Sequence, residues 1–229
     1  MHLRPILAGA ALATLAAAPA AHAAPTLAAL KPCYVAAQPT QRESIAISGT
    51  GFTPLALVDV YIDDVLEPTT PGTPLPQAGY NGAITGQVPA PFVDSGQRAF
   101  SLRLTEHDAP QNTVTATAQV TRLAVEQVPA KAPTHMRVRF RGRGFTALAP
   151  VYAHYVFAGT ARRTVLLGMP SGPCGLFSAR VRQFPFKKSP RVGLWTIQFD
   201  QQQLYDPNAP ARVPLTVRVR KTIKPQPAR

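Results

Sequence analysis

Residues 48–56 read Ser-Gly-Thr-Gly-Phe-Thr-Pro-Leu-Ala, and residues 141–149 read Arg-Gly-Arg-Gly-Phe-Thr-Ala-Leu-Ala. The two copies, counted from Gly49 to Gly142, are 93 residues apart (142 − 49). That period is about the length of one small β-sandwich domain. Each copy lies between runs of alternating or β-branched apolar residues, as β-strands require. The repeat therefore predicts two tandem all-β sandwich domains of one kind.

The repeated Gly-x-Gly-Phe element predicts a structural corner rather than a phosphate-binding loop. A dinucleotide fingerprint needs a third glycine and a following helix, whereas β-rich sequence follows each copy here. We expect glycine to supply a positive φ where a strand ends, and the phenylalanine to turn inward and close the end of the sandwich. The predicted corner residues are Gly49, Gly51, Phe52, Gly142, Gly144 and Phe145.

The first 23 residues are predicted to be a signal peptide. Arg4 provides the positive start, residues 6–18 form an apolar stretch, and Ala21-His22-Ala23 fits a signal peptidase site. Cys33 lies too far beyond the cut for a lipoprotein anchor, and no later apolar run approaches the roughly 20 residues of a membrane span. We expect a secreted protein, extracellular or associated with the cell envelope, with no transmembrane span in the mature chain.

The remaining chain divides into segments at its proline and glycine clusters. We expect a first domain at 26–126, a short linker at 127–134, a second domain at 135–224 and a polar tail at 225–229. Pro129 and Pro133 make the linker semi-rigid. The predicted strands are 44–48, 57–62, 82–88, 99–104 and 113–125 in the first domain, and 136–141, 151–157, 162–167, 176–183, 194–199 and 213–222 in the second.

Several motifs resemble a known group of domains. Gly-x-Gly-Phe-x-Pro followed by Val-x-Val-Tyr-Ile at 58–62 resembles the early strands of bacterial immunoglobulin-like modules of the IPT/TIG kind. The entry Lys-Pro-Cys-Tyr at 31–34 and the Asn-Gly turn at 81–82 are similar to exported bacterial immunoglobulin-like repeats. Residues 172–175 and 194–200 resemble uncharacterised secreted bacterial proteins. The resemblance implies two immunoglobulin-like sandwiches and export, without a specific chemistry. The second copy departs from the Gly-x-Gly-Phe-x-Pro motif, because Ala147 stands where the first copy has Pro54.

Past the predicted signal peptide the chain has two cysteines, Cys33 and Cys174. Export permits a disulfide and an even count is compatible with one. The alternative is two buried free thiols, since cysteine packs as a small apolar residue. The repeat aligns Cys174 with Asn81 (174 − 93), so a bridge would be a long-range link between the two halves.

The net charge of +13 is divided unequally between the halves. Residues 25–130 hold 5 basic against 9 acidic residues, a net charge of −4. Residues 131–229 hold 18 basic against 2 acidic residues, a net charge of +16. A mildly acidic domain therefore precedes a strongly basic one, which indicates an anionic partner for the second.

Candidates for catalysis or metal binding are weak. His107, His135 and His154 are distant in sequence, and no cysteine or close carboxylate accompanies the two that fall near neighbouring strands. We expect the Glu-His-Asp run at 106–108 in a solvated turn, and the acidic residues between 59 and 67 in a hairpin rather than a calcium loop. No Gly-x-Ser-x-Gly motif occurs. We therefore expect no enzymatic activity, cofactor or metal.

Aromatic residues cluster in the second domain without forming a clear sugar-binding platform. Trp195 alternates with Ile197 and Phe199, so these three share one strand face, which we expect to be core. Lys187 and Lys188 are expected in a solvated loop.

Alternating arginines are the one positive indication of function. Successive strand residues point to opposite faces, so arginines two apart line one side of a strand. The alternation occurs in the predicted strands 136–141, 176–183 and 213–222. If these three strands expose the same sheet face, their arginines form a guanidinium array for phosphate or carboxylate groups. The alternative is a solvated face without a ligand. The candidate polyanion-binding residues are Arg137, Arg139, Arg141, Arg143, Arg180, Arg182, Arg218 and Arg220.

The sequence therefore predicts an exported, non-enzymatic binding or envelope-structural module that contacts an anionic envelope polymer through domain 2. Nucleic acid is disfavoured as a partner by export. The alternative is a small secreted hydrolase or enzyme inhibitor that uses the sandwich loops.

Overall fold

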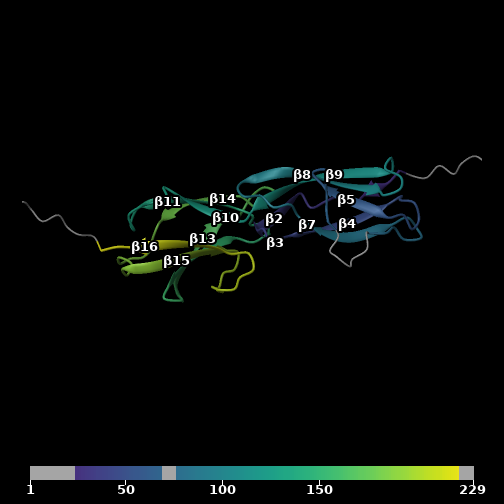
Figure 1. Cartoon of the computed structure of the whole chain (residues 1–229). Helices are drawn as coiled ribbons and strands as arrows, with labels where there is room; N and C mark the ends of the chain where they lie inside the picture. The colour runs from purple at the N-terminus through teal and green to yellow at the C-terminus, as the bar shows by residue number, and fades with distance from the viewer. Residues whose placement is uncertain (1–23, 69–75, 222–229) are drawn as a thin grey trace, which may run out of the picture.

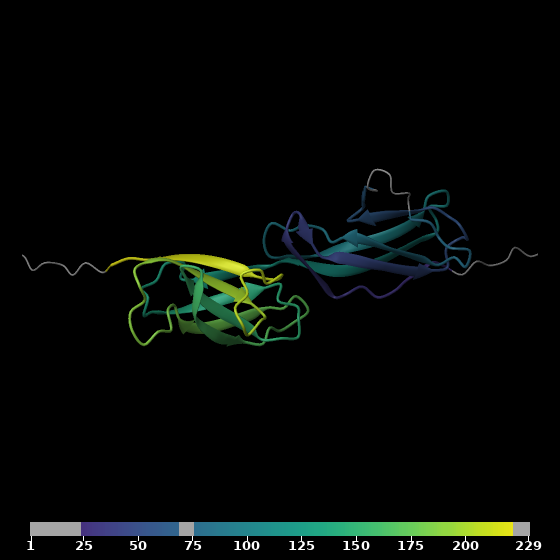
Figure 2. The ribbon, with the colours of Figure 1, turned by 90° about the horizontal axis from the view of Figure 1, so that it is seen from below.

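The computed structural model describes residues 24–68 and 76–221, which form two β-sandwiches arranged end to end (Figures 1 and 2). The described residues form strands, and no helix long and apolar enough to span a membrane occurs among them. The predicted signal peptide and polar tail, the segment 69–75 and the end of the second domain from residue 222 onward lie outside the described residues.

Domain 1 packs a three-stranded sheet against a six-stranded one. The first sheet has the order β1 (Thr26–Leu27), β4 (Ser44–Thr50) and β7 (Ile84–Pro89). The second has the order β3 (Gln41–Arg42), β2 (Cys33–Gln38), β9 (Thr113–Arg122), β8 (Gln97–Glu106), β5 (Val58–Ile62) and β6 (Val65–Leu66). All pairs are antiparallel except β2 with β9. Inward side chains such as Ile45, Leu102 and Val120 fill the core between the sheets.

Domain 2 repeats this architecture. One sheet has the order β10 (Ala124–Val128), β11 (Arg137–Arg143) and β14 (Phe177–Arg182). The other has the order β13 (Thr160–Gly168), β12 (Val151–Phe157), β15 (Gly193–Asp200) and β16 (Val213–Val219). These orders match β1-β4-β7 and β6-β5-β8-β9 of domain 1. The predicted fold class, two tandem immunoglobulin-like sandwiches, is confirmed by this strand order.

The Gly-Phe corners occupy equivalent places in the two domains. Gly51 and Gly144 have φ values of 85° and 86°, and Phe52 and Phe145 are buried in their respective cores. Each corner therefore has the positive φ and the inward ring that the sequence predicts. Gly142 leaves room for the ring of Phe177, because a Cβ atom at this position would lie 2.0 Å from that ring.

A second glycine turn packs against each corner, also at a spacing of 93 residues. The backbone N–H of Phe52 donates to the carbonyl of Gly82 (3.1 Å), and that of Phe145 donates to the carbonyl of Gly175 (3.3 Å). A Cβ atom on Gly82 or Gly175 would lie 2.3 Å or 2.2 Å from the carbonyl oxygen of the phenylalanine. Only glycine permits this approach of two backbones.

The boundary between the domains differs from the predicted one. The predicted strand 113–125 is two strands, β9 in domain 1 and β10 in domain 2, separated by the single residue Leu123. Residues 127 and 128, expected in the linker, pair with β11 as part of β10. Leu123 is buried in the second core, so the apolar alternation continues across the boundary and the sequence shows no break there.

A disulfide and apolar contacts join the two domains at this boundary. Cys33, at the start of β2, is bonded to Cys174 in the glycine turn of domain 2, with Cα atoms 5.2 Å apart. Val35 and Ala37 of β2 pack against the second core. The alternative of two free thiols therefore does not occur in the structure.

Replacing Gly175 by alanine is expected to destabilise the protein by about 2 kcal/mol or more, because the new Cβ combines a positive φ with a clash against Phe145. Gly172 is the control, since it has a similar φ of 70° but open space around a Cβ atom. Its alanine variant should lose about 1 kcal/mol. Urea unfolding measures both losses, and equal losses would contradict the backbone-contact argument.

Removing the disulfide in a Cys33→Ser/Cys174→Ser variant is expected to lower the free energy of unfolding by up to about 5 kcal/mol, because the bridge closes a loop across 141 residues. Chemical denaturation measures this loss. Thiol titration of the unfolded, unreduced wild-type protein should find no free thiol; two thiols per chain would show that the bridge does not form.

Candidate functional site

The outer side of β11 and β14 is an arginine surface. Along β11, Arg137, Arg139 and Arg141 are exposed while Val138 and Phe140 are buried, and β14 follows the same alternation. The strand register places Arg137 opposite Arg182 and Arg139 opposite Arg180. We call this surface the guanidinium face, and it comprises Arg137, Arg139, Arg141, Arg180 and Arg182.

The guanidinium face carries unbalanced charge. Like charges directly opposite one another on neighbouring strands are destabilising. Among the described residues, one ion pair involves this face, between Arg141 and Glu126 of β10 at 3.9 Å. Both side chains are more than half exposed, so this pair contributes little stability and leaves the face strongly positive.

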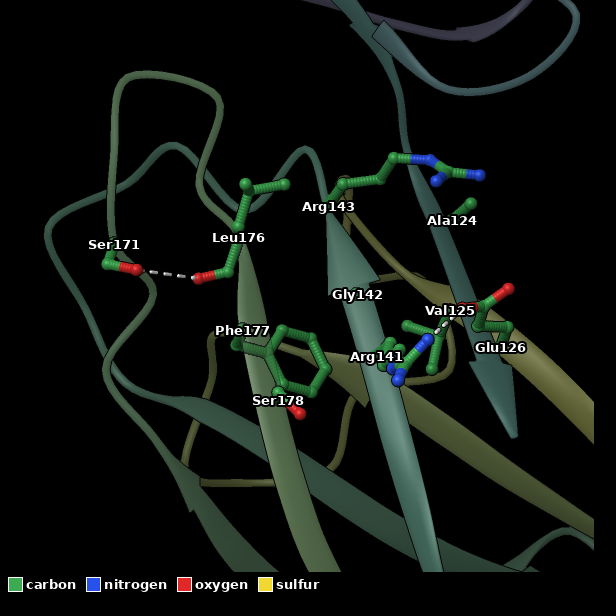
Figure 3. A pocket seen from close by; sticks show the side chains of 10 residues that line it. All are labelled: Ala124, Val125, Glu126, Arg141, Gly142, Arg143, Ser171, Leu176, Phe177 and Ser178. Atoms are coloured by element: carbon green, nitrogen blue, oxygen red, sulfur yellow. Dashed lines mark hydrogen bonds and ion pairs between the residues drawn. The ribbon is translucent and has the colours of Figure 1, made fainter. Parts of the chain in front are cut away.

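A hollow of about 530 Å³ lies at the end of the face nearest domain 1 (Figure 3). Arg141 points toward Glu126, while Arg143 extends beside Ala124. Arg143 is half-buried, unlike the other arginines of β11, and its Nε atom has no hydrogen-bond partner among the described residues. Ser171, Leu176 and Ser178 complete the opposite wall. Arg143 therefore belongs to the hollow rather than to the open face.

Arg218 and Arg220 do not join the guanidinium face. Arg218 lies on β16, which pairs with β15 in the other sheet of the domain, and Arg220 follows that strand. Both line a separate groove of about 390 Å³ together with Lys131 and Gln183. The expectation of one array from three strands is therefore wrong. The two-residue periodicity places the arginines of each strand on one face of that strand, but it does not determine which strands pair in the same sheet.

The two histidines of domain 2 lie apart, His135 in a turn and His154 on a strand. His135 is exposed just before β11, whereas His154 is fully buried on β12. The Nε2 atom of His154 lies 3.1 Å from Oδ1 of Asp200 and 3.1 Å from the carbonyl oxygen of Gln202. Its Nδ1 atom lies 2.9 Å from the hydroxyl of Thr164. In the neutral ring, Nε2 therefore donates and Nδ1 accepts from the hydroxyl.

Asp200 is the centre of this buried network. Burial by itself would raise the pKa of Asp200, but hydrogen bonds from His154, Gln198 and the backbone N–H of Gln202 outweigh it and hold the pKa below its ordinary value. Gln198 also donates to the carbonyl of Asp206 (2.7 Å). The network thus fixes the loop that follows β15 against the sheet.

The predicted solvated turn at 106–108 is only partly solvated. Glu106 is buried and accepts hydrogen bonds from the backbone of Thr53 (2.6 Å) and from Asn112 (2.9 Å), so it anchors the corner of domain 1. His107 is half-exposed, and its hydrogen bond to Asp59 (3.0 Å) raises the pKa of the histidine. The sequence of the polar run 106–108 does not indicate that Glu106 points inward.

The acidic residues of the β5–β6 turn form ion pairs with β8. Asp63 bonds to Arg98 (2.6 Å) and Asp64 to Arg103 (3.1 Å). Within 24–68 and 76–221, no group of three or more His, Cys, Asp and Glu side chains is placed to hold a metal ion.

No family model matches the chain. No curated protein matches it. Among solved structures, a substructure of titin is similar at 13% sequence identity and a TM-score of 0.32, covering 86% of this chain and 97% of its own. The YadV chaperone is similar at 7% identity and a TM-score of 0.27, covering 84% of this chain and 99% of its own.

Replacing His154 by alanine is expected to lower the free energy of unfolding by about 1–3 kcal/mol at neutral pH, because Asp200 loses a hydrogen bond while it stays buried. Urea unfolding of the variant and the wild type measures this loss.

The carboxylate of Asp200 also makes stability depend on pH, because its pKa is lower in the folded than in the unfolded protein. It stabilises the fold at pH values above the unfolded-state pKa, and this stabilisation is lost as the pH falls through the folded-state pKa. An Asp200→Asn variant should lack that acid-dependent loss, whereas Asp206→Asn, the control, should retain it. Unfolding curves between pH 7 and pH 2 measure this, and identical profiles for both variants would contradict it.

Proposed function

We propose that this chain is an exported, non-enzymatic module of the cell envelope that binds an anionic polymer through the guanidinium face. The observation that supports it is the placement of arginines directly opposite one another, Arg137 with Arg182 and Arg139 with Arg180. An anion between two guanidinium groups relieves their repulsion. The planar fork of arginine also matches phosphate and carboxylate groups with two parallel hydrogen bonds.

The shape of the face favours a polymer over a small ligand. Arg137 and Arg141 are four residues apart on one strand, which corresponds to about 14 Å at roughly 3.4 Å per residue. The exposed arginines recur at every second residue along this length. Repeated charges on an open surface suit a chain with repeated anionic groups, because each contact is weak and affinity comes from their number.

Export and family membership are parts of the same proposal. The signal-peptide pattern at 1–23 and the disulfide, which suits an oxidising compartment, support export. The Gly-x-Gly-Phe corners support a place among bacterial secreted modules of the IPT/TIG kind. In such a location the polymer is a phosphate- or carboxylate-bearing component of the envelope rather than nucleic acid.

Replacing Arg137, Arg139 and Arg141 by serine in the chain without its signal peptide is expected to weaken binding to polyphosphate at least about tenfold. These side chains face solvent, so the fold should persist. A matched variant, Arg163→Ser/Arg212→Ser/Arg218→Ser, removes the same charge elsewhere in domain 2 and should bind nearly as wild type.

Binding is measured by titration at two salt concentrations, because exposed charges are screened over about 10 Å at 0.1 M salt. Wild-type affinity should fall steeply with salt. Equal affinities of the two triple variants, or wild-type binding that does not respond to salt, would overturn the proposal.

A further inference from the structure

The end of domain 2 that lies away from domain 1 carries basic residues without acidic ones among the described residues. The three acids of this domain are Glu126, Asp200 and Asp206. Asp200 ends β15 and pairs with Tyr152, near the start of β12, so it lies toward the corner and domain 1. The distal end, where β12 ends and β15 begins, is the left end of the molecule in Figure 1.

A pocket of about 260 Å³ opens at this distal end. Its apolar part is formed by Phe157 of β12, Trp195 of β15 and Phe186 of the loop that joins β14 to β15. The indole of Trp195 packs against both phenylalanine rings, with ring centroids 4.9 Å and 5.4 Å apart. Trp195 is almost fully buried, whereas the two phenylalanines are half-buried, so the pocket exposes the last layer of the core.

Four cationic side chains surround these rings: Arg162, Lys187, Lys188 and Arg191. All four are exposed, and none has a carboxylate within ion-pairing distance among the described residues. Charges next to apolar rings are screened less than charges in open water, so their mutual repulsion is stronger there. The indole N–H donates to the carbonyl of Arg191 (2.9 Å), which fixes the loop that presents them.

We propose that this pocket binds a small organic anion, namely a single aromatic ring that bears a phosphate or carboxylate group. The ring occupies the apolar part, and the anionic group lies among the four cations. A sugar fits less well, because Ser189 is the one neutral polar side chain that lines the pocket and the indole N–H is already bonded. Sugar hydroxyls buried there would lose hydrogen bonds to water without replacement.

This site is separate from the guanidinium face. Its strands, β12, β13 and β15, belong to the four-stranded sheet, whereas the guanidinium face belongs to the three-stranded one. The inference therefore does not depend on polymer binding.

Trp195 is the only tryptophan of the chain, so its fluorescence reports on this pocket alone. Titration of the chain without its signal peptide by phenyl phosphate is expected to give a saturable change in emission. Inorganic phosphate, which lacks the ring, and phenol, which lacks the charge, should each bind at least about tenfold more weakly.

A Lys187→Ser/Lys188→Ser variant should weaken phenyl phosphate binding by about tenfold or more. The matched control, Arg139→Ser/Arg180→Ser, removes the same charge from the guanidinium face and should bind phenyl phosphate as wild type does. Circular dichroism establishes that both variants are folded.

The proposal is overturned if phenyl phosphate gives no saturable change with the wild-type protein, if inorganic phosphate binds as well as phenyl phosphate, or if the two variants lose affinity equally. Loss of polyphosphate binding in the Arg137, Arg139 and Arg141 variant, with phenyl phosphate binding intact, distinguishes the two sites.

Discussion

The contact between a phenylalanine corner and a glycine turn is the constraint on which each domain depends. At the corner the chain leaves one sheet and enters the other, and the glycine turn holds that crossing by a backbone hydrogen bond. Because the two backbones touch, the contact leaves no space for a Cβ atom. In domain 2 the same turn has Cys174 directly before Gly175, so the corner also positions the cysteine that reaches domain 1.

Acidic and basic residues are distributed unevenly between the two domains. Domain 1 contains most of the acidic residues, and several are used internally, as in the ion pairs of Asp63 and Asp64. In domain 2 the buried Asp200 is held by hydrogen bonds and contributes nothing to the outer surface. The described arginines and lysines of domain 2, apart from the half-buried Arg143, are exposed over both sheets and the distal end. A long face of regular charges and a small aromatic pocket suit ligands of different size.

Local patterns in the sequence predict the strands and corners well, because alternation and glycine conformation are local properties. They fail where long-range pairing decides the outcome. Residues 33–38 lack clear alternation, yet they form β2 because they pair in parallel with β9. Arg218 has the same periodicity as Arg180, but pairing with β15 places it on the other sheet. The inward direction of Glu106 depends on Thr53, which is 53 residues away in sequence.

The disulfide gives the junction a property that a simple tandem of domains lacks. The domains are connected twice, once through the backbone at Leu123 and once through Cys33 and Cys174. A single cut of the backbone near Leu123 therefore leaves the two halves covalently attached as long as the bridge is oxidised. In surroundings rich in proteases, a molecule with such a nick stays in one piece, and its basic half remains tethered to its acidic half.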